Sequence, residues 1–375
     1  MSRVLVTGGA GFVGSHVVDA LVVGGHHVRV LDLLHPAAHR AEPEHLNPAA
    51  EYLWGDVADP DVTAAAIAGV DAVCHQAAMV GLGVDFGDAS AYATHNDLGT
   101  AVLLETLHRH AGRVQRLVLA GSMVVYGEGR YRCAAHGVVR PHPRTREQLD
   151  ARQWDPRCPH CRAALTPEPV PEDAPVDPCN VYAATKLHQE HLCSAFGRAH
   201  PDVAVTALRY HNVYGPRMPD DTPYAGVAAI FRSALARGRA PQVFEDGGQQ
   251  RDFVHVRDVA RANVLALTAR EPVPGALNVA SGRPRSVLDM ADALASAFGD
   301  APPPVVTGGY RVGDVRHVVG DPTAARDRVG FVAEVDFADG MRELARRAPV
   351  PASSSGRARF ARRSRTQLAV RGRAT

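Results

Sequence analysis

The chain has 375 residues, 46% of them hydrophobic, and a formal net charge of +1 at pH 7, so it is long enough for two lobes with a shared core and has no general attraction to nucleic acid. It has no apolar run of about 18 residues and starts without a basic segment ahead of an apolar one, so we expect a cytoplasmic protein that is neither exported nor inserted in a membrane. Its six cysteines are expected to be buried, free or metal-bound rather than paired in disulfides.

The first predicted strand is the apolar run 4–6, which ends in the glycine-rich segment 7–15 (TGGAGFVGS) ahead of a helical pattern. Strand, glycine turn and helix follow in the order that a dinucleotide site requires. Gly8 permits the tight turn, Gly11 lets the backbone approach a pyrophosphate, and Gly14 lets the helix pack on the strand. The glycine spacing, three and three, differs from the commonest fingerprint. The predicted cofactor-binding residues here are Gly8, Gly11, Phe12, Val13 and Gly14.

A second predicted strand, 27–31, ends at Asp32. A carboxylate there can accept both ribose hydroxyls and repels a 2′-phosphate, so NAD is expected rather than NADP. The strand 52–54 ends in residues that can border the adenine. The strand 72–75 ends in small residues that let the backbone lie against the cofactor. The candidates at these two ends are Asp56, Val57, Ala77 and Ala78. His75 is expected to be a core histidine rather than a catalyst.

The next predicted helix, 91–110, carries the cofactor candidate Asn96 and an apolar stripe typical of core or of a helix-pairing interface. The buried strand 116–120 then delivers Ser122 at its carboxyl end, the edge at which open parallel sheets bind ligands. Ser122 can hydrogen-bond a reacting hydroxyl there, although turn chemistry explains a lone serine equally well.

The segment 128–177 is rich in Pro and Arg and has almost no apolar periodicity. A core this small needs a metal ion or another cross-link to be stable. Two ligand pairs separated by 21 residues have the spacing of a zinc ribbon or knuckle. The predicted ligands of a structural zinc are Cys133, His136, Cys158 and Cys161. His160 and Cys179 are possible substitutes. Unpaired thiols in a loose loop and a redox pair are the alternatives.

Of the 41 lysines and arginines, Lys186 is the only lysine. Positions four apart share a helix face, so the Lys186 ammonium is expected beside the Tyr182 ring. A cation there favours the phenolate and moves the pKa of Tyr182 from about 10 toward the range of a general acid/base. By itself this pattern also fits an ordinary solvated helix face.

Together these motifs resemble the extended short-chain dehydrogenase/reductases, particularly the nucleotide-sugar epimerases and dehydratases. The likeness covers 1–127 and about 177–345, which makes 128–177 an insertion. Its motifs are 7–14, Asp32, 56–57, 121–127, 182–186, 209–216 (RYHNVYGP), 251–260 (RDFVHVRDVA) and 311–317. The resemblance implies a homodimer and a catalytic triad of Ser122, Tyr182 and Lys186, the last two also touching NAD. It implies sugar-nucleotide contacts at Met123, Asn212, Arg251 and Arg311.

Within that family, 4,6-dehydratases carry an acidic pair after the catalytic hydroxyl residue, where this chain has Met123 and Val124. Mannose-type 3,5-epimerases carry a cysteine in this loop, and this chain has none between Ser122 and Gly127. The resemblance thus implies a 4-epimerase or a net NDP-4-keto-sugar reductase. It is nearest to the dTDP-L-rhamnose 4-epimerase type, through 126–132, 222–227 and 244–247. A UDP-sugar or UDP-uronate 4-epimerase and a non-catalytic NAD- or sugar-nucleotide-binding protein are the alternatives.

The predicted fold is α/β, a Rossmann-like doubly wound parallel sheet with a smaller C-terminal substrate lobe and a zinc-ribbon-like insertion. A sugar nucleotide is the expected partner, and neither a membrane nor a nucleic acid is expected. The predicted parts are the NAD-binding domain 1–127, the insertion 128–177, the catalytic helix and strand 178–215, a mainly substrate-binding lobe 216–348 and a disordered basic tail 349–375.

Overall fold

The computed structural model describes residues 1–375 except 37, 40–42, 82–85, 111, 220–225 and 347–375. The predicted disordered tail, 349–375, and residues 222–225 of the motif 222–227 lie outside the described residues. Among the helices that are described, none combines the length and the apolar character needed to cross a membrane.

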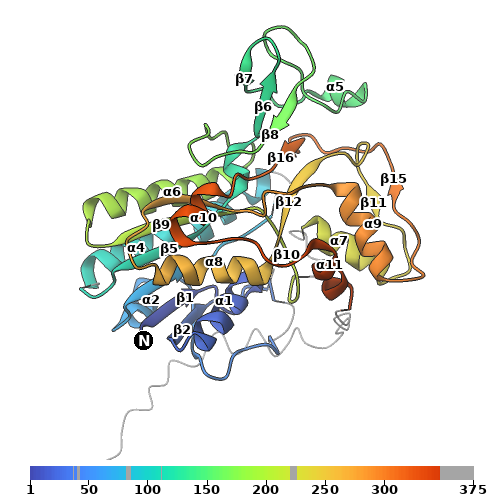
Figure 1. The fold of residues 1–375 in the computed structure, drawn as a ribbon. Helices are drawn as coiled ribbons and strands as arrows, with labels where there is room; N and C mark the ends of the chain where they lie inside the picture. The colour runs from blue at the N-terminus through green and yellow to red at the C-terminus, as the bar shows by residue number, and fades with distance from the viewer. Residues whose placement is uncertain (37, 40–42, 82–85, 111, 220–225, 347–375) are drawn as a thin grey trace, which may run out of the picture.

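A seven-stranded parallel sheet forms the centre of the molecule (Figure 1). In spatial order the strands are β13 (Gly275–Val279), β9 (Ala204–Tyr210), β5 (Arg116–Ser122), β4 (Ala72–His75), β1 (Arg3–Thr7), β2 (His27–Asp32) and β3 (Glu51–Trp54). The chain order changes direction between β1 and β4, and open sheets bind ligands at the carboxyl ends of the strands at such a point. The predicted Rossmann-like sheet is confirmed.

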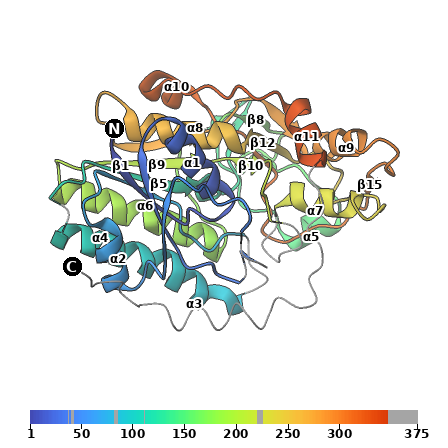
Figure 2. The same ribbon diagram turned by 90° about the horizontal axis from the view of Figure 1, so that it is seen from below.

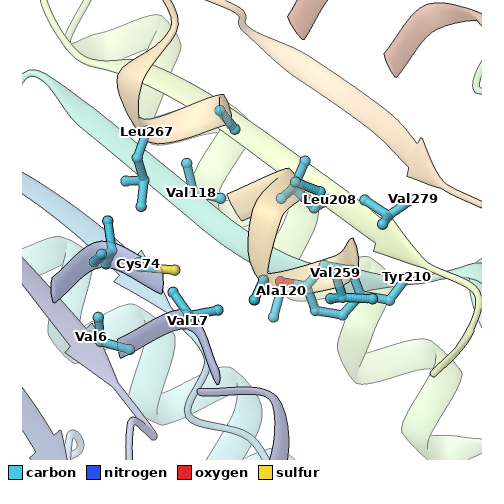
Figure 3. Close-up of a cluster of buried hydrophobic side chains, with 14 of the residues drawn as sticks. Val6, Val17, Cys74, Val118, Ala120, Leu208, Tyr210, Val259, Leu267 and Val279 are labelled. Atoms are coloured by element: carbon cyan, nitrogen blue, oxygen red, sulfur yellow. The ribbon is translucent and has the colours of Figure 1, made fainter. Parts of the chain in front are cut away.

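Helices cover both faces of this sheet. One face is packed by α1 (Phe12–Val23) and α8 (Val256–Thr268), and the other by α2 (Pro60–Ile67), α4 (Gly99–His110) and α6 (Val181–Ala199). Figure 2 shows α2 and α4 on one side of the strands and α8 on the other. Figure 3 shows Val17 of α1 and Val259 of α8 among side chains of β1, β4, β5 and β9. The central strands are buried on both faces, as their continuous apolar sequences predict.

The predicted helix 91–110 is interrupted. It begins with η1 (Phe86–Asp88) and α3 (Ala89–Tyr92), widens into a π-helical turn, η2 (Ala93–Leu98), and continues as α4. In the widened turn the Asn96 carbonyl accepts a hydrogen bond from the Thr100 hydroxyl at 2.6 Å. Such π-helical turns are frequent at functional sites, and this one turns Asn96 toward the carboxyl edge of the sheet.

The C-terminal lobe has its own small sheets and core. Its strands are β10 (Asn212–Tyr214), β12 (Gln250–His255), β14 (Pro284–Ser286) and β16 (His317–Val318), with β11 (Gln242–Val243) paired to β15 (Val305–Val306). Its helices are α7 (Val227–Leu235), α9 (Val287–Ala297) and α11 (Phe337–Arg346). The segment 216–348 is less separate than predicted, because α8, β13 and α10 (Thr323–Val329) pack with the main sheet.

The insertion projects from the body of the molecule at the top of Figure 1. It contains a three-stranded antiparallel sheet and one short helix. These elements are β6 (Arg130–Cys133), β7 (Gly137–Val139), β8 (Thr166–Glu168) and α5 (Arg146–Asp150).

Candidate active site

The glycine turn after β1 is built for a backbone that must pass very close to its neighbours. Gly8 has φ +68°, and a Cβ added there would lie 2.7 Å from the Ala77 nitrogen. A Cβ at Gly14 would lie 2.1 Å from the Gly8 carbonyl oxygen. Gly11 caps α1 without a side-chain hydrogen bond, so the N–H groups of the first turn face the space above the strand ends. This cradle fits a pyrophosphate.

Asp32 stands at the end of β2 and faces the glycine turn. Its Oδ2 accepts a hydrogen bond from the Ala10 nitrogen at 3.0 Å, and its Oδ1 accepts one from the Leu34 nitrogen at 2.8 Å. Each carboxylate oxygen keeps a further lone pair for a ribose hydroxyl. His39, which no sequence pattern singled out, lies with Nε2 3.9 Å from Oδ1. Burial holds the pKa of His39 below its usual value.

The other predicted cofactor residues lie on neighbouring strand ends. The Asp56 Oδ1 accepts a hydrogen bond from the Ala58 nitrogen at 2.9 Å, directly after β3, and Val57 is buried beside it. The Ala77 nitrogen donates to the Thr7 hydroxyl at 3.1 Å, which holds the ends of β4 and β1 together, and Ala78 follows. The structure therefore gathers all of these residues at one edge.

Ser122, Tyr182 and Lys186 come together across β5 and α6. Ser122 is the last residue of β5, and Tyr182 lies in the first turn of α6, one turn before Lys186. Ser122 lies close enough to the Tyr182 hydroxyl to lower the pKa of this phenol. The Lys186 ammonium is buried and donates to the Ala120 carbonyl at 3.0 Å. The arrangement can hold a substrate hydroxyl beside a phenol and a serine.

The expected lowering of the Tyr182 pKa is wrong for the protein alone. Burial raises the pKa of Tyr182 to about 12, and only the interaction with Ser122 opposes this shift. Burial lowers the pKa of Lys186 to about 8, against the charges of Cys193 and Asp97. Because the ammonium donates to a backbone carbonyl instead of the phenol, desolvation decides the direction of the Tyr182 shift.

Replacing Lys186 by methionine is expected to raise the free energy of unfolding at pH 7 by about 1–3 kcal/mol, because the wild type buries a charge there. The pKa of Lys186 is about 8 in the folded protein and 10.5 ordinarily. Below pH 8 both states carry the charge and the burial penalty is complete. Between these values the unfolded state binds more protons, so wild-type stability rises with pH and the advantage of the variant disappears.

Denaturant unfolding from pH 6 to 10 checks this expectation. Arg198→Met on the exposed end of the same helix is the matched control and should change stability little at any pH. A Lys186→Met protein less stable than wild type at pH 7 would contradict it.

Asn96 is held by protein groups at the carboxyl edge of the sheet. Its side chain is fully buried, its Oδ1 accepts from the Met79 nitrogen at 2.7 Å, and its amide nitrogen donates to the Met79 carbonyl and the Thr185 hydroxyl at 3.0 and 2.9 Å. These bonds fix the segment after β4 against α6. The predicted contact of Asn96 with the cofactor stays a prediction.

Sequence reasoning missed the residues that fasten α6 to the sheet. Gln189 donates to the Thr100 hydroxyl at 2.7 Å, and Glu190 pairs through both oxygens with Arg209 of β9, at 3.1 and 2.5 Å. The spacing in the sequence could have indicated these two residues, because Gln189 and Glu190 follow Lys186 by three and four positions and so share its helix face. His75, by contrast, is the core histidine expected, bonded to the Thr7 hydroxyl at 2.7 Å.

The predicted sugar-nucleotide residues are not all placed alike. The Asn212 Oδ1 is buried, and no described residue offers it a hydrogen bond. Met123 is 9% exposed next to Ser122, and the exposed Arg311 guanidinium lies 5.5 Å from the Phe244 ring centroid. The Arg251 guanidinium donates to the carbonyls of Val315 and Arg316 at 2.7 and 3.0 Å, and its predicted contact with the sugar nucleotide stays a prediction.

Comparisons with known proteins agree with this geometry. The sequence profile of the NAD dependent epimerase/dehydratase family matches residues 4–280. A dTDP-L-rhamnose 4-epimerase of Burkholderia thailandensis is 35% identical over 347 residues, which are 91% of this chain and 93% of that protein. The crystal structure of a Thermotoga maritima UDP-glucose 4-epimerase with UDP-glucose matches with a TM-score of 0.74, at 30% identity, over 92% of this chain and 97% of that one. A Thermus thermophilus UDP-glucose 4-epimerase in complex with NAD matches with a TM-score of 0.73 at the same identity and coverage.

Proposed function

The chain belongs to the NAD-dependent epimerase/dehydratase family, and we propose that it is a nucleotide-sugar 4-epimerase acting by transient oxidation and re-reduction of C4. The observation that carries the proposal is that Tyr182 and Lys186, one turn apart on α6, lie beside Ser122 at the end of β5 and next to the glycine cradle. Met123 and Val124 follow Ser122 and are apolar, so they can neither abstract a proton nor expel water. This favours epimerisation over dehydration.

NAD, when bound, supplies a hydride acceptor for C4 and a positive charge that favours the Tyr182 phenolate. The phenolate takes the proton of the 4-hydroxyl while C4 loses its hydride, which leaves a 4-keto sugar and a neutral phenol. Ser122 shares the hydrogen bond to the reacting oxygen, and the buried Lys186 ammonium balances the phenolate charge. Re-reduction on the other face of the keto sugar would invert C4, and Tyr182 would return the proton to the C4 oxygen.

The residues present fit this cofactor. The backbone of the glycine turn, Gly8 to Gly14, would hold the pyrophosphate, and Asp32 would hold the adenosine ribose. Asp56 and Val57 would border the adenine. Ala77 and Ala78, with Tyr182 and Lys186, would border the nicotinamide ribose.

The proposed substrate is a dTDP-L-rhamnose-type 6-deoxysugar nucleotide. Its support is the 35% identity to the B. thailandensis protein across nearly the full length of both chains. UDP-sugars are the second candidate, supported by the structural match to UDP-glucose 4-epimerases. The unpartnered Asn212 oxygen and the exposed Arg311 are the proposed contacts to the nucleotide sugar. The homodimer stays a prediction. The insertion would add a structural zinc ion.

We expect the purified protein to carry about one NAD per chain and to convert its substrate without added cofactor, because an epimerase regenerates its NAD in every cycle. The measurement is incubation with a panel of dTDP- and UDP-sugars, followed by separation of the C4 epimers. Steady consumption of NADH would make the protein a ketoreductase instead, and turnover of none of the panel would favour a binding protein. Preference for NADP would overturn the role of Asp32.

A further inference from the structure

Four side chains of the insertion aim their donor atoms at one point. The Cys133 sulfur lies 3.6 Å from the His136 Nδ1 and 3.6 Å from the Cys161 sulfur, and the Cys158 sulfur lies 3.6 Å from the same Nδ1. All four donor atoms lie within 4.8 Å of one another. A tetrahedral zinc with bonds of about 2.3 Å to sulfur and 2.0 Å to nitrogen spaces its ligands about 3.5–3.8 Å apart. A disulfide would need about 2.05 Å, so the distances fit a metal.

The two ligand pairs sit on equivalent turns. The residue after each second ligand has a left-handed backbone, φ +68° at Gly137 and φ +61° at Arg162. A non-glycine residue in this conformation is uncommon and needs support from its surroundings. Ligation of Cys161 to a shared metal would provide that support.

The insertion has little else to hold it together. Its own apolar cluster consists of Tyr131, Cys133, Val139 and Cys158, with Leu165 partly buried beside it. The end of the insertion, at Val170, Ala174 and Val176, packs instead with a cluster of the body. Two of the four buried residues in its own cluster are themselves candidate ligands, and the strands are three or four residues long. A core of this size does not order a segment of about 50 residues without a metal or another cross-link.

From these observations we propose that Cys133, His136, Cys158 and Cys161 bind one structural zinc ion, and that this ion holds the insertion against the segment that carries Arg311. Four protein ligands complete a tetrahedral shell and leave no position for a catalytic water. The second part of the proposal concerns the sugar-nucleotide site, so it rests on the proposed function.

A buried ionic network joins the insertion to that segment. The Arg144 guanidinium donates to the Glu245 carboxylate at 2.9 Å and to the Asp314 carbonyl at 2.7 Å. The Asp155 carboxylate accepts from the Arg316 Nε at 2.8 Å. The side chains of Arg144, Glu245 and Arg316 are at most 3% exposed, so loss of the insertion partners would leave buried charges unpaired. Asp314 and Arg316 follow Arg311 by three and five residues. Their bonds to Arg144 and Asp155 therefore connect the insertion to the proposed sugar-nucleotide site.

Metal analysis of protein purified without chelator tests the ligands. We expect about one zinc per chain in the wild type, and less than about 0.2 in Cys158→Ser/Cys161→Ser. His136→Cys should keep the zinc, because thiolate replaces imidazole in such shells. His160→Ala is the matched control and should also keep it, since its ring lies 5.0 Å from the His136 ring without belonging to the cluster. Cobalt added to chelator-treated protein should give the d–d bands of a tetrahedral thiolate site.

Kinetics test the second part of the proposal, that the zinc ion holds the insertion against the segment that carries Arg311. The zinc-free variant should raise the KM for the sugar nucleotide about tenfold or more while bound NAD is retained, and His160→Ala should not. Wild type with less than about 0.2 zinc that takes up no cobalt, or a Cys158–Cys161 disulfide in its place, would overturn the site. An unchanged KM in a zinc-free variant would overturn the second part of the proposal. Zinc content is read without turnover, so a protein that binds zinc but converts no sugar would refute only the proposed function.

Discussion

Tyr182→Phe is expected to lower kcat by about 10²- to 10⁴-fold and to leave NAD bound, because the phenol performs the proton transfer. Its hydroxyl lies beside Ser122 at the carboxyl edge of the sheet, whereas the proposed cofactor contacts lie mainly on the glycine turn and Asp32. Loss of the hydroxyl should therefore abolish the proton transfer and leave the binding of NAD unchanged. The measurement is kcat on the identified sugar nucleotide together with the NAD content of the purified variant.

Tyr92→Phe is the matched control. The Tyr92 ring centroid lies 5.9 Å from that of Tyr182, but its hydroxyl donates to the Gly81 carbonyl at 2.8 Å. We expect kcat of this variant within about threefold of wild type. A Tyr182→Phe enzyme that also stays within about threefold would remove Tyr182 from the mechanism.

Gly14→Ala is expected to reduce bound NAD to less than about 0.1 per chain and to destabilise the protein by about 1–3 kcal/mol. In most helices this exchange stabilises by about 0.5–1 kcal/mol. Here the added Cβ would lie 2.1 Å from the Gly8 oxygen and 2.9 Å from the Gly9 Cα. Both contacts are with backbone that cannot rotate away, so α1 must move off the turn and the cradle opens.

The cofactor released on denaturing the protein, measured together with denaturant unfolding, checks this expectation. Gly112→Ala is the control, because a Cβ there has no described atom within 4 Å. Wild-type NAD content in Gly14→Ala protein would mean that the pyrophosphate does not lie at this turn.

The strand ends and the catalytic helix were predictable because each depends on residues close in sequence. The apolar run before the glycine turn forms β1, and the buried run before Ser122 forms β5. Tyr182 and Lys186 share a helix face by their spacing alone. Parallel strands then carry their carboxyl ends to one edge of the sheet, so residues that follow different strands meet there.

The interruption of the helix 91–110 was not predictable, because its cause lies elsewhere in the chain. The apolar stripe continues through the widened turn and gives no sign of it. Asn96 finds partners 17 residues away at Met79 and 89 residues away at Thr185. The bonds of Arg251 to carbonyls 64 and 65 residues away could not be predicted either, for the same reason.

Periodicity and spacing, which are local, were enough to predict the order of strand, glycine turn and helix, and the carboxylate at the end of β2. They also predicted the pairing of Tyr182 with Lys186 on one helix face and the two ligand pairs of the insertion. Three features became visible only in the folded protein: burial raises the pKa of Tyr182, protein groups engage Asn96 and Arg251, and the two ligand pairs meet within 4.8 Å. Burial and hydrogen-bond partners are set by segments far apart in the chain, and these meet only when the chain folds.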